Sequence, residues 1–280
     1  MTITEKALLV NLDISMWGAH KHDKTVSQKV EQDYKAHDAG RYNKALIKKE
    51  SLHEVQNAAS KARTFLYKRT LPWGDNGDRV LSSAVYFDFI REYKEFKDKF
   101  DVAVTEFIAQ YPSLKDEAQQ SLKDMYQETD YPSVNALWKK FGMDMKFMAI
   151  PNSDDFRIQL DKEEVDTLRS SIEQELNSRV VQATKYMYAR IKDAVGHMVD
   201  RLSDKDALFR DTLITKIREL VEVLPRLNFT DDPGITDVVD SMKNLCEVKP
   251  DKLRHNTMLR AKKAEEAKAI LDKVSGFLAS

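Results

Sequence analysis

Residues 161–224 read DKEEVDTLRSSIEQELNSRVVQATKYMYARIKDAVGHMVDRLSDKDALFRDTLITKIRELVEVL. Apolar side chains recur there every three or four positions, which is the spacing of one face of an α-helix. The stripe consists of Val165, Leu168, Ile172, Leu176, Val180, Ala183, Met187, Ile191, Ala194, Met198 and Leu202. No proline or glycine interrupts it before Gly196. The stretch therefore predicts a long helix that leaves a packed body and projects, or that pairs narrowly with one partner.

The later half of this helix carries a second apolar stripe beside the first. It begins after Val180 and consists of Val181, Tyr188, Val195 and Val199. Two adjacent stripes make a wider apolar face, so we expect the later half to be more deeply buried than the earlier half.

Composition limits the function classes that fit this chain. Its 280 residues are 42% hydrophobic, which is enough for a core without disulfides or metals. Charged residues make up 32% but nearly cancel, to a net charge of −1. A generally basic nucleic-acid coat and a wholly acidic DNA mimic are both excluded by that balance. Cys246 is the only cysteine, so neither an intrachain disulfide nor a cysteine-based metal site can form, as suits a reducing cytoplasm.

The amino-terminal residues 7–17, ALLVNLDISMW, alternate apolar and other side chains with a period of two. This pattern predicts a β-strand. The apolar run is too short and too interrupted for a signal peptide, and no stretch reaches the roughly 20 apolar residues of a membrane span. We therefore expect a cytoplasmic protein.

A strand needs partners, and the best ones lie far downstream. Residues 145–150, MKFMAI, are followed by turn residues at 151–155 and by alternating apolar residues at 156–160. We expect a hairpin that joins the amino-terminal strand in a small antiparallel sheet.

The remaining segments are predicted to be helical, apart from a loop at 71–80 that is rich in glycine, asparagine and aspartate. A helix with the aromatic stripe Val85 to Tyr111 should end at Pro112, and we expect its stripe to meet the long central helix. The other predicted helices span 26–36, 42–68, 113–125, 134–141, 207–224, 235–246 and the tail from 250.

The predicted fold is mainly α with a small antiparallel sheet (α+β), an elongated, coiled-coil-like hairpin of long helices on a helical body. We expect three segments: a mixed body at 1–160, a long helical segment at 161–227, and carboxy-terminal helices at 228–280.

Several stretches together resemble an uncharacterised family, a domain of unknown function encoded mainly by bacteriophages and prophages. They are LLVNLDISMWGAHKHDK (8–24), DAGRYNKALI (38–47), TLPWGDNGDRVL (70–81), DYPSVNALWKKF (130–141), PNSDDFRIQL (151–160) and ELVEVLPRLNFTDDP (219–233). The resemblance covers most of the chain and implies a phage accessory protein in the host cytoplasm, sometimes encoded near MoxR-type ring ATPases and von Willebrand A-type proteins. It implies no catalytic residue.

One basic patch is a candidate nucleic-acid site. A helix end that carries Lys61, Arg63, Lys68 and Arg69 runs into a loop with Trp73. Arginine and tryptophan together can hold a phosphate and stack a base. The alternative is a helix terminus stabilised by cations next to a buried tryptophan.

Other candidates fit structural roles better. His20 and His22, with Asp23, His37 and Asp38, lack a further zinc-ligand cluster at a recognisable spacing. Residues 75–78 lack the ligand series of a calcium loop. The carboxylate pairs at 154–155, 163–164 and 231–232 have no evident catalytic partner, and Cys246 has no evident activating base.

We therefore expect no catalytic residue, no metal and no cofactor. The favoured function is a non-enzymatic phage-type accessory or assembly protein whose long amphipathic helices contact a second copy or another protein, such as a ring ATPase. The alternative is a nucleic-acid-binding accessory factor in phage replication or recombination, and a third possibility is an enzyme whose site forms only in three dimensions.

Overall fold

The structure, a computed structural model, describes residues 3–74, 76–152, 162–204 and 211–279. It is 72% helical with a small antiparallel sheet, which confirms the predicted fold class. The α-helices are α1 Ile3–Lys6, α2 Lys24–Tyr34, α3 His53–Arg69, α4 Tyr86–Leu122, α5 Val134–Trp138, α6 Lys162–Ser203, α7 Asp211–Leu227, α8 Pro233–Cys246, α9 Pro250–His255 and α10 Thr257–Ala279. Short 3-10 helices are η1 Lys49–Leu52, η2 Ser83–Val85, η3 Lys123–Met125 and η4 Glu128–Asp130.

The main sheet has the strand order β4-β5-β1-β6. Its strands are β1 Ala7–Ser15, β4 Leu71–Pro72, β5 Arg79–Ser82 and β6 Gly142–Ala149. The predicted amino-terminal strand and its neighbour near 145–150 are confirmed, while the second arm of the predicted hairpin, 156–160, lies outside the described residues. The prediction of a continuous loop at 71–80 was wrong, because β5 pairs with β1 from Ala7–Ser82 to Val10–Arg79.

A second, two-stranded sheet pairs β2 His20–His22 with β3 Asn43–Ala45. The helix predicted from about Tyr42 therefore begins only at His53. The reason is local: the Tyr42 amide donates to Ser27 Oγ, and β3 takes its hydrogen bonds from β2. Strand pairing outweighs the helical spacing of these few residues.

Helix α4 continues through Pro112 to Leu122, so the predicted end at Pro112 was wrong. A proline inside a helix removes one hydrogen bond, here to the carbonyl of Ile108. Pro112 itself is exposed, whereas Tyr111 and Ala118 on the same helix are buried. Packing on both sides of the proline holds the helix together. Pro225 likewise lies inside α7, two residues before its end.

Contacts group the chain into two compact units. Unit 1 comprises residues 1–11, 66–89 and 146–280, and unit 2 comprises residues 12–65 and 90–145. Both units are discontinuous in sequence, whereas the segments expected from the sequence were contiguous.

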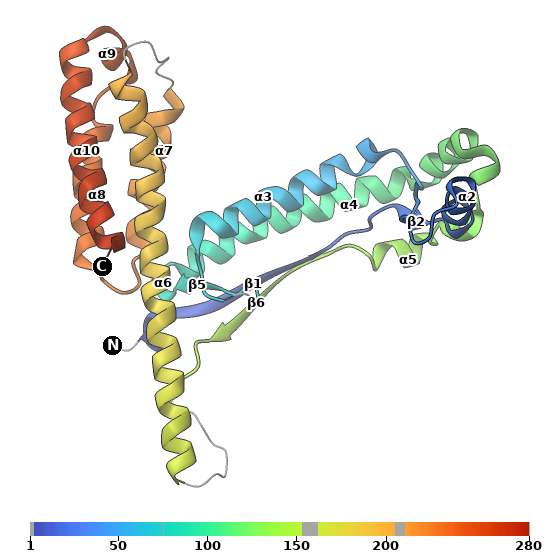
Figure 1. The fold of residues 1–280 in the computed structure, drawn as a ribbon, viewed down its shortest axis with the longest axis horizontal. Coiled ribbons are helices and arrows are strands. Elements are labelled where there is room, and N and C mark those ends of the chain that lie inside the picture. The colour runs from blue at the N-terminus through green and yellow to red at the C-terminus, as the bar shows by residue number, and fades with distance from the viewer. Residues whose placement is uncertain (1–2, 75, 153–161, 205–210, 280) are drawn as a thin grey trace. The chain divides into compact units, whose positions relative to one another are not determined.

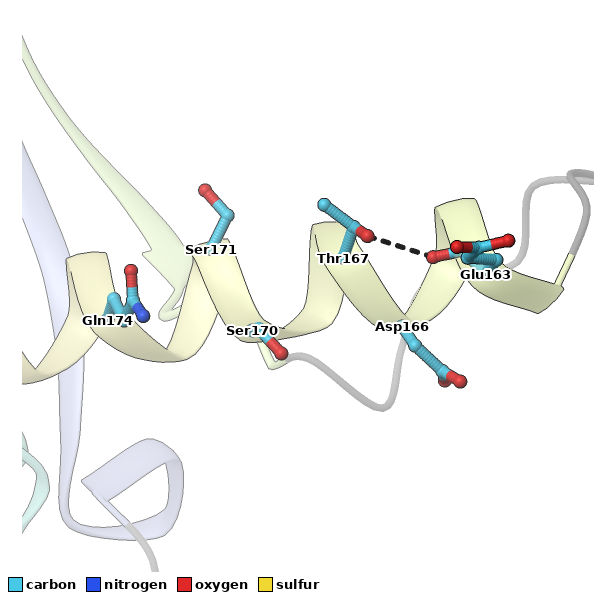
Figure 2. Close-up of a pocket in the computed structure, with 6 residues that line it drawn as sticks. All are labelled: Glu163, Asp166, Thr167, Ser170, Ser171 and Gln174. Atoms are coloured by element: carbon cyan, nitrogen blue, oxygen red, sulfur yellow. Dashed lines mark hydrogen bonds between the residues drawn. The ribbon is translucent and has the colours of Figure 1, made fainter.

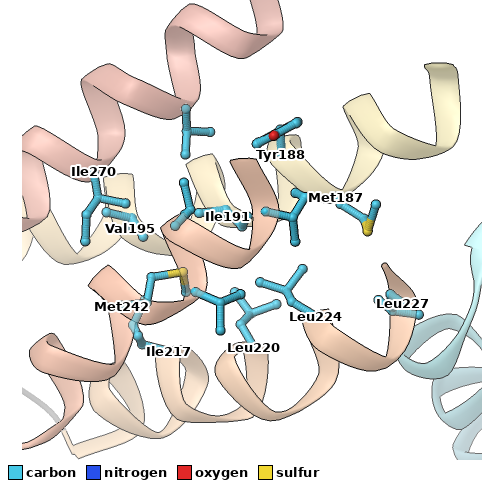
Figure 3. Close-up of a cluster of buried hydrophobic side chains, with 14 of the residues drawn as sticks. Met187, Tyr188, Ile191, Val195, Ile217, Leu220, Leu224, Leu227, Met242 and Ile270 are labelled. Atoms are coloured by element: carbon cyan, nitrogen blue, oxygen red, sulfur yellow. The ribbon is translucent and has the colours of Figure 1, made fainter. Parts of the chain in front are cut away.

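The core of unit 1 forms where α6, α7, α8 and α10 pack together, as Figure 1 shows. Figure 3 shows Met187, Ile191 and Val195 of α6 facing aliphatic side chains of the neighbouring helices. Fully burying one such side chain contributes about 1.5–3 kcal/mol. The α6 stripe supplies Ala183, Met187, Ile191, Met198 and Leu202 to this core, all at most 3% exposed.

The core of unit 2 is aromatic. Trp17 lies edge-on to Tyr111, with ring centroids 5.7 Å apart, and Phe107 contacts both Trp17 and Phe141. Nearer the start of α4, Phe96 stacks on Phe65 of α3, with ring centroids 4.9 Å apart. The aromatic stripe thus packs on these rings, while the later half of α6 buries its stripe against α7, α8 and α10. The expected pairing of the two stripes was wrong.

Candidate functional site

A cavity of about 380 Å³ in unit 1 is lined mainly by apolar side chains. Its apolar lining comes from β1, from the segment that joins β4 to β5, from the end of β6 and from α6. These residues are Leu9, Trp73, Pro151, Ile172 and Leu176. Sequence reasoning missed this cavity, because the lining residues are far apart in the chain and only strand pairing and helix packing bring them together.

The charged groups at this cavity already have partners. Arg179 donates from Nε to Glu175 Oε1 (2.7 Å) and from Nη1 to the carbonyl of Trp73 (2.6 Å). Asp78 accepts from Asn11 (2.9 Å) and from Asn76 (2.7 Å). A Cβ on Gly74 would lie 2.5 Å from Arg179 Nη1, so glycine permits this close approach. The cavity is therefore suited to an apolar side chain rather than to acid–base chemistry.

Next to the cavity, the apolar stripe of α6 loses its cover. From Ala183 onward most of the stripe is buried, but among the preceding positions none is: Leu168 is 37% exposed, and Val165, Ile172, Leu176 and Val180 are half-buried. The first half of α6 therefore carries an apolar face that the described part of the chain leaves partly exposed.

A shallower hollow lies along the same half of α6 and is shown in Figure 2. All its described lining residues come from this one helix: Glu163, Asp166, Thr167, Ser170, Ser171 and Gln174. The Thr167 hydroxyl donates to the carbonyl of Glu163 at 2.9 Å, an ordinary helix-internal contact. Figure 2 shows the side chains pointing to different sides of the helix, so they do not converge on one point.

The residues predicted to bind nucleic acid do not all lie in one unit. Lys61 and Arg63 belong to unit 2, whereas Lys68, Arg69 and Trp73 belong to unit 1. Lys61 and Lys68 are exposed, Arg63 and Arg69 are half-buried, and Lys68 pairs with Glu219 at 3.1 Å.

Trp73 is a core residue. It is 5% exposed and belongs to the hydrophobic cluster of unit 1, and its amide donates to the carbonyl of Asp78. A buried indole offers no face to an incoming base. Trp73 therefore has a structural role, as a buried side chain in the core of unit 1.

The histidine-rich segment forms a strand. His20 and His22 lie on β2, and His22 Nε2 is 3.2 Å from Ser27 Oγ. His37 is exposed. Across the described residues, no group of three or more histidine, cysteine or acidic side chains is arranged to hold a metal ion.

Two acidic positions have clear structural partners. In the loop after β4, Gly77 has a φ of 87°, and the Asp78 carboxylate accepts hydrogen bonds from the side chains of Asn76 and Asn11. Asp75 lies outside the described residues. Asp232 is the N-cap of α8, accepting from the Gly234 amide at 2.7 Å, and its carboxylate also accepts from the Tyr188 hydroxyl. These carboxylates stabilise a turn and a helix start.

Three further predicted candidates remain. Glu163 lies in the first turn of α6 with Glu164, and the pair Asp154 and Asp155 falls outside the described residues. Burial raises the pKa of the Cys246 thiol, although the nearby charge of Arg218 opposes the shift. A thiol with a raised pKa is a weaker nucleophile at neutral pH.

Comparisons with protein-family models, curated proteins and solved structures found no match for this chain. Among the helices that the structure describes, none combines the length and apolar character needed to cross a membrane.

Proposed function

We propose that this protein is a non-enzymatic accessory or assembly protein that binds another protein through the first half of α6. The observation that carries the proposal is the uncovered continuation of the α6 stripe, beside an apolar cavity with space for a side chain. A helix face that is buried over one half and exposed over the other is typical of a surface completed by a partner.

A second copy of the chain is the partner that the stripe fits best. Leu168 and Leu176 lie four residues to either side of Ile172. Two copies running antiparallel through Ile172 would thus place leucine against leucine. Arg169 and Glu175 lie three residues to either side, so the same arrangement would bring opposite charges together. The exposed half of α6 is about 28 Å long, which implies a small interface and weak, concentration-dependent association.

The resemblance to a phage family supplies the context of this proposal. A phage-type accessory protein in the host cytoplasm would act with other components, and a MoxR-type ring ATPase is the second partner to test. The proposal of a non-enzymatic role is supported by two side chains of types that often act in catalysis. Asp232 accepts from the Gly234 amide, and His22 Nε2 contacts Ser27 Oγ, so both have structural contacts.

The test is a double substitution on the stripe, Leu168→Glu with Leu176→Glu, which places like charges opposite one another in the proposed register. Two carboxylates on an apolar seam would each have to be desolvated, so we expect dimerisation to weaken by about tenfold or more. Sedimentation equilibrium over a concentration series measures the change.

The matched control is Ser170→Glu with Gln174→Glu, which adds the same charge to the same half of α6 but on the exposed polar side. It should associate like the original protein. A monomer up to about 0.1 mM that also fails to bind a purified MoxR-type ATPase would contradict the proposal.

A further inference from the structure

Two arginines from distant parts of unit 1 meet at the carboxyl end of α3. Arg79 of β5 donates from Nε to Thr70 Oγ1 (2.6 Å) and from Nη2 to the Thr70 carbonyl (3.0 Å). Arg190 of α6 donates from Nη1 to the carbonyl of Lys68 (3.4 Å). Both guanidiniums are thereby directed at the same turn of the chain.

These two positive charges lack an acidic partner within the described part of the chain. Arg79 is only 9% exposed and Thr70 is fully buried. Burial lowers the pKa of Arg79; the hydroxyls of Tyr186 and Tyr67 oppose this shift, and the nearby charge of Arg190 adds to it. Burial also lowers the pKa of Arg190. Two like charges held near one another, one buried and one partly buried, are costly unless an anion joins them.

Both guanidiniums keep donors for such an anion. A guanidinium has five N–H groups. Arg79 uses its Nε and Nη2 nitrogens on Thr70 and also hydrogen-bonds the Tyr186 side chain, and Arg190 uses Nη1 on Lys68. Capping at the end of α3 explains the backbone contacts, but it supplies no counter-charge for the two guanidiniums.

Exposed aromatic rings flank the pair. The Arg79 guanidinium lies over the Tyr67 ring, 4.7 Å from its centroid, yet Tyr67 is 53% exposed. Tyr186 is 40% exposed and lies close enough to influence both arginines. Tyrosine rings at the rim of a basic site offer stacking surfaces to a planar base.

We propose that Arg79 and Arg190, flanked by Tyr67 and Tyr186, bind the phosphate of a nucleotide, either free or within a single strand. A free nucleotide carries a phosphate monoester with two negative charges, whereas each phosphate of a strand is a diester with one. Both forms present several acceptor oxygens to which two guanidiniums can donate. The rings then stack on the attached base. This site uses neither the exposed stripe of α6 nor the cavity beside it, so it goes beyond the proposed protein contacts.

The experiment is a calorimetric titration of the full chain with AMP, adenosine, inorganic phosphate and a single strand of about ten nucleotides. We expect AMP to bind at least about tenfold more tightly than adenosine or phosphate, because only AMP supplies both groups. Tighter binding of the strand with the same variant sensitivity assigns the site to single strands, and binding of AMP alone assigns it to free nucleotides.

Arg190→Gln and Tyr186→Ala should each weaken AMP binding by about tenfold or more. Arg226→Gln is the matched control, because it removes one arginine from an exposed position of α7, and it should bind AMP unchanged. Because Arg79 is buried, its substitution risks the fold, and Arg190 is the better test. Circular dichroism and the melting temperature confirm that each variant is folded.

Three results would overturn the proposal: no binding of AMP or of the strand, equal binding by folded Arg190→Gln, or equal competition by an oligoglutamate peptide. Each is independent of self-association, which the sedimentation experiment measures separately.

Discussion

At the scale of single residues, Lys44 is the most consequential charge in unit 2. It is 2% exposed, its ammonium lies 2.7 Å from Asp130, and it donates to the carbonyl of Met125 at 2.7 Å. Asp23 is 4.0 Å away. A buried charge with these partners fixes how the β2–β3 sheet packs on the residues that follow α4.

We predict that Lys44→Met destabilises the protein by about 3–5 kcal/mol, because it leaves the Asp130 carboxylate buried and unpaired. Urea unfolding measures the change. Adding Asp130→Asn to Lys44→Met should restore part of the loss, since the buried charge is then gone.

The control for this experiment is Lys48→Met. Lys48 pairs with Glu117 at 2.8 Å, but both side chains are exposed, so little change is expected. Equal effects at Lys44 and Lys48 would show that burial does not determine the strength of these pairs.

At the scale of elements, the helical spacing of apolar residues predicted where helices form better than proline predicted where they end. The stripe of α6 and the short helix α5, capped by Ser133, were both predicted correctly. Proline was over-weighted, because α4 and α7 both contain one. Tertiary packing of the flanking turns offset the local cost at Pro112.

Pro112→Ala should therefore stabilise the protein by about 1–2 kcal/mol. The substitution restores an N–H donor for the Ile108 carbonyl, and part of that gain is lost because alanine leaves the unfolded chain freer. Denaturant unfolding measures it. Pro225→Ala, two residues from the end of α7, should give a smaller gain. A lower stability of Pro112→Ala would contradict the interpretation that Pro112 costs the helix a hydrogen bond and that packing of the flanking turns offsets this cost.

At the scale of the whole molecule, both units bury tyrosines whose hydroxyls are directed at backbone or carboxylate acceptors. Tyr93 donates to the carbonyl of Met143 and Tyr131 to that of Leu46 in unit 2, and Tyr188 donates to Asp232 in unit 1. Burial, with added repulsion from nearby acids, raises the pKa of Tyr93 and of Tyr131 to about 12. Burial and Asp232 raise the pKa of Tyr188 as well.

These shifts predict that stability falls in base. Above pH of about 10 the unfolded chain releases phenolic protons that the native protein retains until about pH 12. The free energy of unfolding should therefore decrease across that window and be unaffected by these groups below it. Unfolding in urea at a series of pH values measures the slope.

Tyr131→Phe should make that slope shallower, because it removes one of the buried phenols. Tyr34→Phe provides the comparison, since Tyr34 is 80% exposed. An unchanged slope in Tyr131→Phe would contradict the assignment.

The candidate site was only partly predictable from the sequence. The patch at Lys61, Arg63, Lys68, Arg69 and Trp73 was identified by proximity along the chain, yet Trp73 is buried in the core. The arginine pair proposed to bind phosphate went unrecognised, because Arg79 and Arg190 come from a strand and a helix that are far apart in sequence.

The sequence by itself determined the helical class, the long stripe of α6 and the strands at both ends of the amino-terminal half. Those features depend on periodicity, which is a property of neighbouring residues. Only the tertiary structure decided where helices run past a proline, which short segments pair as strands, and which half of the α6 stripe is covered. Those outcomes depend on burial and hydrogen bonds between residues distant in the chain, whose energies no local pattern contains.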